Sequence, residues 1–136
     1  MSSTLRPTGR VEAFANWVTA LGDAWERGDA ESFRTLFVVA ATFAPDPFAT
    51  WLRRRAAIEA WFSEQFAAWP AAAFTAQVLG AGDTYGVAHF RVTSGERVLD
   101  GVWVVALDAR GRCESLRQWW HESPAELPVE RAISEA

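Results

Sequence analysis

The sequence lacks several features that would assign the protein to particular functional classes. Cys113 is its one cysteine among 136 residues, so it can form no internal disulfide and no cysteine-rich metal site, which suits a reducing compartment. Acidic residues outnumber basic ones, the net charge is −4 and the sequence pI is about 5.2. Basic side chains cluster only in the short run at 53–55, so the attraction to phosphate that drives nucleic-acid binding is missing. We therefore expect no nucleic-acid partner.

Long apolar runs are also missing. The apolar stretches at 38–43 and 102–107 are far shorter than the roughly 20 residues that a membrane-spanning helix needs. Residues 1–10 are polar and hold no apolar run, so we expect no secretory signal. Together these observations predict a cytoplasmic protein with no membrane partner.

Aromatic and apolar residues, in contrast, are abundant. The chain has eight tryptophans and nine phenylalanines, half of its residues are hydrophobic and 22% are charged, which is typical of one packed domain. We expect that domain to span residues 11–122, between a flexible segment at 1–10 and a loose tail at 123–136. Because a buried indole N–H needs a partner, so many tryptophans favour a cavity or an interface as well as a core.

Helical periodicity marks two segments of the first half of the chain. Apolar residues recur at three- and four-residue steps over 11–27 and over 55–69, which predicts two amphipathic helices. Gly28 ends the first of them. Asp29 then suits the N-cap of a short helix that runs to Phe37.

Strand signals follow each helical region. Residues 38–43 are β-prone, and Pro45 and Pro47 end that strand because proline cannot donate to a sheet ladder. After the last helix, short turn-forming clusters separate four segments of alternating character, which predicts an antiparallel meander. The four expected strands are 74–81, 84–93, 98–107 and 112–122. Helices first and strands after predict an α+β domain whose helices pack on one face of a curved sheet.

The order of these elements and a set of short motifs point to a known family. The motifs are Gly28-Asp29 with Phe33, Leu36-Phe37, Asp46-Pro47-Phe48, Ala57-Ile58, Gly111-Arg112 and residues 116–120. Over residues 11–122 the sequence resembles the nuclear transport factor 2-like superfamily, which includes ketosteroid isomerase and polyketide cyclases. The resemblance implies a cystatin-like α+β fold, with a cone-shaped, curved antiparallel sheet wrapped around the helices. It specifies the fold better than the function, because this fold hosts many unrelated activities.

Alternation along the last three strands separates two faces of the expected sheet. The bulkier and less charged set is assigned to the inner face: Ala88, Phe90, Val92, Leu99, Gly101, Trp103, Val105, Leu107, Leu116, Gln118 and Trp120. The other face carries His89, Asp100, Arg117 and His121. A register error of one residue would exchange the two faces.

The resemblance implies that the inner face and the helices enclose a cone that opens to a small molecule. We expect its ligand-binding wall to consist of Trp17, Leu21, Phe48, Trp51, Trp61, Phe62, Phe90, Trp103, Gln118 and Trp120. A wall with this many aromatic residues suits a flat or polycyclic hydrophobic ligand. We expect no cofactor. The alternative is that these aromatic side chains meet and fill the cone.

Asp46 is the candidate catalytic residue. It resembles the aspartate general base of ketosteroid isomerases, which lies in an Asp-Pro step after the first strand and moves a proton at a carbon next to a carbonyl. Aromatic walls around the carboxylate would desolvate it and make it a better proton acceptor. The alternative is structural, because an aspartate before proline commonly begins a turn and caps backbone N–H groups.

Three positions depart from the isomerase pattern. Its oxyanion hole uses a tyrosine of the first helix and an acid of a strand, where this sequence has Leu21 and Trp103; its supporting tyrosine is replaced by Phe62. Without these donors the negative charge that develops during the reaction has no support. We therefore do not expect steroid isomerisation by that mechanism.

The remaining polar candidates have structural readings too. Gln118 on an apolar face either binds a ligand or satisfies a group within the chain. His89 and His121 lie near Asp100 in the expected sheet but match no metal-site spacing, so we expect no metal. The resemblance to limonene-epoxide hydrolase would require an Asp-Arg-Asp set inside the cone, whereas Arg91, Arg117 and Asp100 are expected to point outward.

The outer face of the expected sheet is unusually apolar. It collects Val87, Val98, Val102, Val104 and Trp119. Such a patch is typical of an interface, and relatives of this fold pair through their sheets, so we expect a homodimer. Three functional hypotheses stay open: a cofactor-independent isomerase, cyclase or lyase that uses Asp46, a module that binds a hydrophobic molecule without turnover, and an assembly domain.

Overall fold

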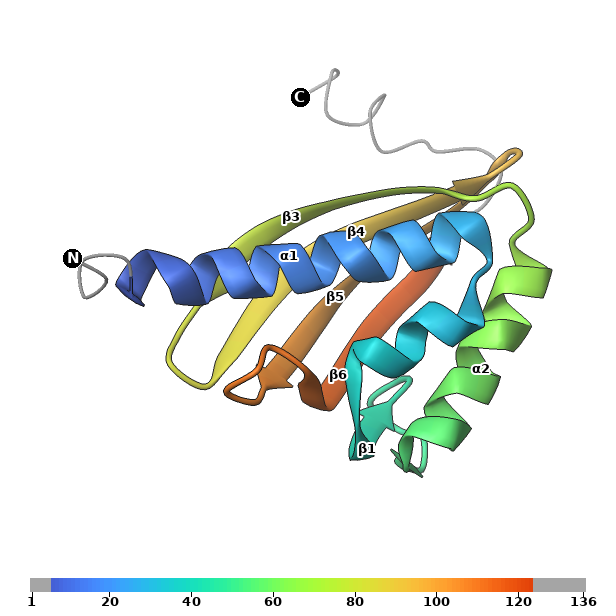
Figure 1. Ribbon diagram of the computed structural model, residues 1–136. Coiled ribbons are helices and arrows are strands. Elements are labelled where there is room, and N and C mark those ends of the chain that lie inside the picture. Colours follow the sequence, from blue (N-terminus) through green and yellow to red (C-terminus); the bar gives the residue numbers. More distant parts are fainter. Residues whose placement is uncertain (1–5, 124–136) are drawn as a thin grey trace, which may run out of the picture.

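The protein is a mixed α+β domain with one curved sheet, as the sequence predicts (Figure 1). The computed structural model describes residues 6–123. In chain order its elements are helix α1 (Arg6–Arg27), 3-10 helix η2 (Ala30–Thr35), β1 (Phe37–Ala44), β2 (Leu52–Arg53), α2 (Arg55–Ala68), β3 (Ala73–Ala81), β4 (Tyr85–Ser94), β5 (Arg97–Leu107) and β6 (Cys113–Ser123). Of the helices that these residues form, none has both the length and the hydropathy that crossing a bilayer requires.

The six strands form one sheet in the order β2-β1-β6-β5-β4-β3. Strands β3 to β6 pair antiparallel with their neighbours along the chain, which confirms the meander. β1 instead pairs in parallel with β6, so the sheet is not wholly antiparallel. β2 is a two-residue strand that pairs antiparallel with β1 and that the sequence patterns did not predict.

Helix α1 buries the stripe that its periodicity predicted. Phe14, Trp17 and Leu21 on this stripe are at most 2% exposed. The helix ends at Gly28, whose φ of 63° lies in the left-handed region that glycine adopts without strain. Asp29 then caps η2, because its carboxylate accepts hydrogen bonds from the backbone N–H and the hydroxyl of Ser32.

Two boundaries of the expected domain differ from the structure. α1 begins at Arg6, five residues before the expected start. Pro7 lies in its first turn, where a proline is tolerated because the N–H there has no intrahelical partner. β6 includes Ser123, which was assigned to the tail. The rest of the expected tail, 124–136, and residues 1–5 lie outside the described residues.

The sheet has the inner and outer faces that the alternation predicted. Phe90, Val92, Trp103 and Val105 are fully buried, while the residues between them in β4 and β5 are half-buried or exposed. Cross-strand pairing places Trp103 directly opposite Gln118. Helix α1 lies across the inner face and α2 lies beside the β1 end of the sheet (Figure 1).

Candidate functional site

Asp46 lies in a turn after β1. Its Oδ1 accepts a hydrogen bond of 2.8 Å from the backbone N–H of Phe48, and its carbonyl accepts one of 3.2 Å from Ala49. The carboxylate therefore stabilises the turn, as the side chain of an aspartate at the start of a turn commonly does. The residue is half-buried, so one side of it meets solvent.

The polar side chains expected to face a ligand are paired within the chain. Trp103 donates from Nε1 to Gln118 Oε1 at 2.7 Å, and Gln118 Nε2 donates to the carbonyl of Pro45 at 3.1 Å. Trp17 Nε1 donates to the carbonyl of Leu36 at 2.9 Å. Gln118 is 1% exposed, so its two hydrogen bonds offset the cost of burying an amide.

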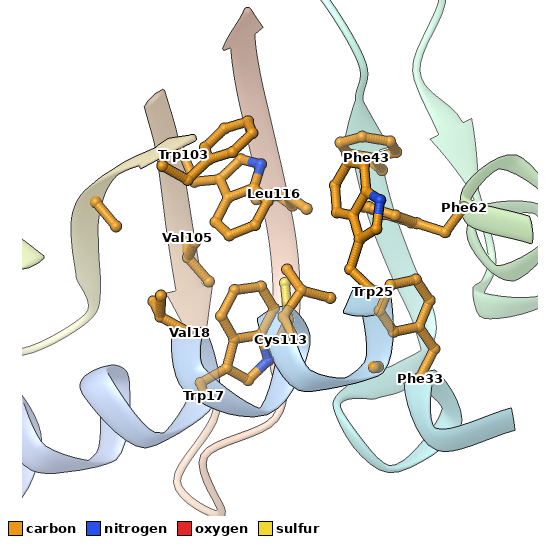
Figure 2. Packing of buried hydrophobic residues seen from close by; sticks show 14 of the residues in the cluster. Trp17, Val18, Trp25, Phe33, Phe43, Phe62, Trp103, Val105, Cys113 and Leu116 are labelled. Atoms are coloured by element: carbon orange, nitrogen blue, oxygen red, sulfur yellow. The ribbon is translucent and has the colours of Figure 1, made fainter. Parts of the chain in front are cut away.

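The aromatic side chains of the inner face form a packed cluster instead of the wall of a hollow (Figure 2). We call this set the interior cluster: Trp17, Leu21, Phe43, Phe62, Phe90, Trp103 and Leu116. Each of these side chains is at most 2% exposed, so no water-sized space lies beside them. Phe90 stacks on Trp103 with 4.1 Å between ring centroids, and Phe43 stacks on Phe62 at 5.3 Å. The rings contact one another because the inner face of the sheet and the helices approach each other to within contact distance.

Of the other expected wall residues, Trp61 and Trp120 pack against the buried core from its rim. Trp61 and Trp120 are half-buried, and their ring centroids lie 5.3 Å apart. Trp51 is also half-buried. Phe48 was expected to line the interior, which is wrong: it is 96% exposed, because the Asp46 turn directs it away from the domain.

The positions that hold the oxyanion-hole donors and the supporting tyrosine in ketosteroid isomerases offer no free donor here. Leu21 and Phe62 carry no polar atom, and the one N–H of Trp103 is bound to Gln118. Trp25 has a buried indole N–H without a hydrogen-bond partner among the described residues. Its ring packs at 84° against Phe62, so it belongs to the aromatic core.

A cleft of about 650 Å³ opens beyond the interior cluster. We call it the open-end cleft. Its lining comes from the N-terminal half of α1 and from the turns that join β3 to β4 and β5 to β6. Figure 1 shows these elements at one end of the sheet. Its lining consists of Gly9, Arg10, Ala13, Phe14, Ala81, Gly82, Asp83, Thr84, Tyr85, Gly86, Leu107, Asp108, Ala109 and Gly111.

The floor of this cleft is apolar and its rim is polar. The Phe14 ring lies on the backbone of Gly86 in β4, where a Cβ atom would meet the ring at 2.5 Å. At the rim, Arg10 Nη1 donates to the carbonyl of Asp83 at 2.7 Å. This contact connects α1 to the β3–β4 turn across the edge of the cleft.

Asp108 is the carboxylate fixed most firmly at this rim. It accepts hydrogen bonds of 2.9 Å from the backbone N–H groups of Arg112 and Arg110, and the Arg112 guanidinium lies 3.4 Å away. The backbone N–H of Arg112, that of Arg110 and the Arg112 charge lower the pKa of Asp108 against a smaller opposing effect of burial. A carboxylate held ionised in this way is a poor proton acceptor.

No local pattern in the sequence marks the open-end cleft. Arg10 falls in the expected flexible segment, Phe14 in the first expected helix, and residues 82–83 and 108–111 between expected strands. One signal was available: in a meander, alternate turns fall at the same end of the sheet, so these two turns had to be neighbours.

The charged residues of the outer face form their own network. Asp100 lies 2.8 Å from His89 Nε2 and 2.9 Å from the Arg91 guanidinium. Burial raises the pKa of Asp100, but the hydrogen bonds from His89 and Arg91 outweigh it and the pKa is lowered overall. Arg117 lies over the ring of Trp119 at 4.9 Å. Asp100 and Arg117 thus point outward, so an Asp-Arg-Asp set does not form inside the domain.

The cysteine of the chain is not placed to react. Cys113 is fully buried, and burial raises the pKa of its thiol, which keeps it in the unreactive protonated form. Residues 6–123 contain no group of three or more histidine, cysteine or acidic side chains arranged to hold a metal ion.

Comparison with known proteins places this architecture in a family. Residues 18–122 match the SnoaL-like domain. No curated protein matches the sequence significantly. The resemblance to the nuclear transport factor 2-like superfamily that the motifs suggested is confirmed by this match and by the solved structures.

Three solved structures illustrate the shared fold. An NTF-2 like protein of unknown function from Burkholderia xenovorans LB400 has a TM-score of 0.70 at 18% identity, covering 91% of this chain and 94% of that one. SalBIII, an epoxide hydrolase/cyclase-like enzyme of pyran ring formation in salinomycin, has 0.68 at 17%, covering 85% and 92%. A steroid delta-isomerase from Pseudomonas aeruginosa has 0.64 at 17%, covering 90% and 87%. At these identities the likeness shows the fold alone.

Proposed function

Because the chain belongs to the SnoaL-like domain family, we propose that it binds a small, largely apolar molecule, and that the open-end cleft is the binding site. The observation that carries this proposal is the cleft itself. Its volume of about 650 Å³ falls within the range of about 300–1,000 Å³ that is usual for small-molecule sites. Its floor is apolar around Phe14 and Leu107, and its few polar groups lie at the rim.

The closed interior is the reason to place the ligand at the open end. A ligand in the interior cluster would have to displace side chains such as Trp103 and Phe62, which are fully buried. It would also break the hydrogen bond between Trp103 and Gln118. A ligand in the open-end cleft displaces only solvent and the exposed contact between Arg10 and Asp83, an exchange that costs far less.

A bulky substitution at Ala13 tests the proposal. Ala13 is exposed and lines the cleft, so Ala13→Trp should fill it. The probe is the dye 1-anilinonaphthalene-8-sulfonate, an apolar ring system with one anionic group, followed by its fluorescence. We expect Ala13→Trp to weaken dye binding by about tenfold or more, since it removes the space for the ring system.

Val11→Trp is the matched control. Val11 is 43% exposed, lies on the same helix and is not part of the cleft lining, so the variant adds an indole elsewhere. It should bind the dye as the unaltered protein does. Equal binding by both variants would place the dye outside the cleft and contradict the proposal.

Catalysis by Asp46 is a second candidate function, in which the protein would act as a cofactor-independent isomerase, cyclase or lyase. Two observations favour it: Asp46 is half-buried in the turn after β1, and structures of similar fold include a cyclase-like enzyme and a steroid isomerase. A substrate would reach this partly exposed carboxylate without opening the interior cluster.

Asp46→Asn separates the two functions. Asparagine keeps the Oδ1 acceptor for the Phe48 N–H, so the turn is preserved. If Asp46 is a general base, proton exchange at the carbon next to the carbonyl of a cyclic ketone, followed by NMR in deuterated water, falls at least about a hundredfold in this variant. The binding proposal expects no turnover in either protein and unchanged dye affinity.

The outer face of the sheet is the proposed contact of a homodimer. Its half-buried apolar residues include Val102, Val104 and Trp119, and its charges at Asp100 and Arg91 are paired within the chain. A face whose buried area is apolar and whose carboxylate is paired in this way can pack against a copy of itself. Sedimentation should show a dimer that Trp119→Lys converts to monomer, whereas a monomeric unaltered protein would contradict this contact.

A further inference from the structure

Strand β3 presents a free edge. In the described part of the chain it pairs only with β4, and it is the last strand of the sheet order. Its nine residues contain no proline and no charged side chain. Proline or a charged side chain on the strand commonly protects such an edge from pairing with other chains, and residues 73–78 hold neither; helix α1 reaches the edge at Phe74, through Glu26.

One contact shows which backbone groups of β3 point away from β4. The backbone N–H of Phe74 donates to Glu26 Oε2 of α1 at 2.7 Å, so it points away from β4. Because every second residue of an antiparallel strand presents its N–H and C=O to the same side, Ala76 and Val78 also present theirs to the free edge. The edge therefore offers a ladder of three consecutive outward positions.

A groove of about 270 Å³ runs beside these positions. We call it the edge groove; it is lined by Ala15, Val18, Thr19, Gly22, Asp23 and Glu26 of α1 and by Phe74, Ala76 and Val78 of β3. α1 runs alongside β3 (Figure 1). At one end the Phe74 ring lies directly on Gly22. A segment that paired with β3 would place alternate side chains against α1.

The charges of the edge groove favour a particular partner. Asp23 and Glu26 are its charged residues, both acidic, exposed and near the Phe74 end. A second copy of this chain, with a net charge of −4, would bring the same carboxylates to its own β3. A basic side chain on the bound segment would instead be attracted to them.

We infer that the edge groove docks an extended segment of a partner protein, with small or β-branched residues at alternate positions and a lysine or arginine at the end that meets Glu26. The segment adds a strand to β3. In the free protein the Phe74 N–H donates to the Glu26 carboxylate. On docking, a backbone carbonyl of the segment replaces the carboxylate as the acceptor. The released carboxylate then pairs with the basic side chain. This surface is separate from the open-end cleft, so the inference does not depend on the proposed ligand.

Synthetic peptides test the inference on the full chain. The probes are two fluorescein-labelled peptides of alternating valine and threonine, one with a lysine at its C-terminal end and one with it at its N-terminal end. Binding is followed by fluorescence anisotropy. We expect the first to bind if the segment runs antiparallel to β3 and the second if it runs parallel, since each orientation brings the lysine to Glu26. Binding of neither would overturn the inference.

Variants of β3 and α1 define the binding mode. Ala76→Pro removes the N–H that faces the free edge, which an edge strand tolerates, and should weaken binding by about tenfold. Thr75→Val alters the other face of the same strand and should leave binding unchanged. Glu26→Gln keeps the acceptor for the Phe74 N–H but removes the charge, so it should weaken the lysine peptide by about two- to fivefold and leave a peptide without lysine unaffected.

Methylation of the peptide backbone gives a readout that does not depend on how a variant folds. Methyl groups on amides that face β3 should abolish binding, whereas methyl groups on the amides between them should not. Equal binding of both methylated peptides, or equal binding to Ala76→Pro and Thr75→Val, would contradict strand addition. Self-association of the chain that Ala76→Pro removes would assign the edge to a second copy and likewise overturn the inference.

Discussion

The two ends of the space between α1 and the sheet are built from different residues. The interior cluster is filled by rings, among them Trp17, Phe62 and Trp103, which have almost no exposed surface. Half of the residues that line the open-end cleft are glycine or alanine, including Ala13 and Gly111, and the cleft remains open. The difference shows that an abundance of aromatic side chains here produces a core. The cavity occurs where side chains are small.

Removal of an interior ring should have the largest effect. Trp103 is fully buried, stacks on Phe90 and donates to Gln118. Trp103→Ala should lower the free energy of unfolding by roughly 3–5 kcal/mol, because it removes apolar contacts and leaves a cavity. Urea denaturation followed by circular dichroism measures it.

Phe48→Ala is the aromatic control for that prediction. Phe48 is 96% exposed, so its removal should change the free energy of unfolding by less than about 0.5 kcal/mol. Similar losses in the two variants would mean that the interior cluster is not the core of the domain.

Gln118→Leu should have an intermediate effect. Leucine is of similar size but carries no polar atom in its side chain, so the Trp103 N–H and the Pro45 carbonyl lose their partner. Because both groups are buried, the free energy of unfolding should fall by roughly 1–3 kcal/mol. Thermal or urea unfolding checks this. A neutral or stabilising result would show that water or a ligand reaches these groups, and the interior would then not be closed.

A smaller effect than that of Gln118→Leu is expected at the rim of the open-end cleft. Asp108→Asn should lower the free energy of unfolding by less than about 1 kcal/mol near neutral pH. The pKa of Asp108 is lowered in the folded state. The stabilisation that its carboxylate gives to the fold is therefore complete above the unfolded-state pKa of about 4, and it is lost as the pH falls through the folded-state pKa. Urea unfolding from pH 7 to pH 2 should show the two proteins converging in acid. A difference that grows in acid would contradict this account of the rim.

Much of the fold could be predicted because it depends on local patterns. The spacing of Phe14, Trp17 and Leu21 specifies the buried face of α1, and Gly28-Asp29 specifies its end. Alternation in β4 and β5 specifies the two faces of the sheet. These signals lie within one element, so the sequence of that element contains them.

Other features depend on how distant elements meet, and local patterns do not contain them. The parallel pairing of β1 with β6 joins segments about 75 residues apart along the chain, from Phe43 to Leu116, and β2 is too short to show a period. Alternation assigned Phe90 and Trp103 to the inner face correctly, but it could not tell whether their rings touch. The turn at Asp46 was a stated alternative, which the contact with Phe48 confirms.

The most direct test follows the indole and backbone N–H resonances of the protein during a titration with 1-anilinonaphthalene-8-sulfonate. The account predicts that the amides of Ala13, Gly86 and Gly111 at the open-end cleft shift. The indole resonances of Trp17 and Trp103, whose N–H groups are bonded inside the chain, should stay unchanged. Shifts of those two indoles with no change at Ala13 and Gly86 would place the ligand inside the domain and contradict the account.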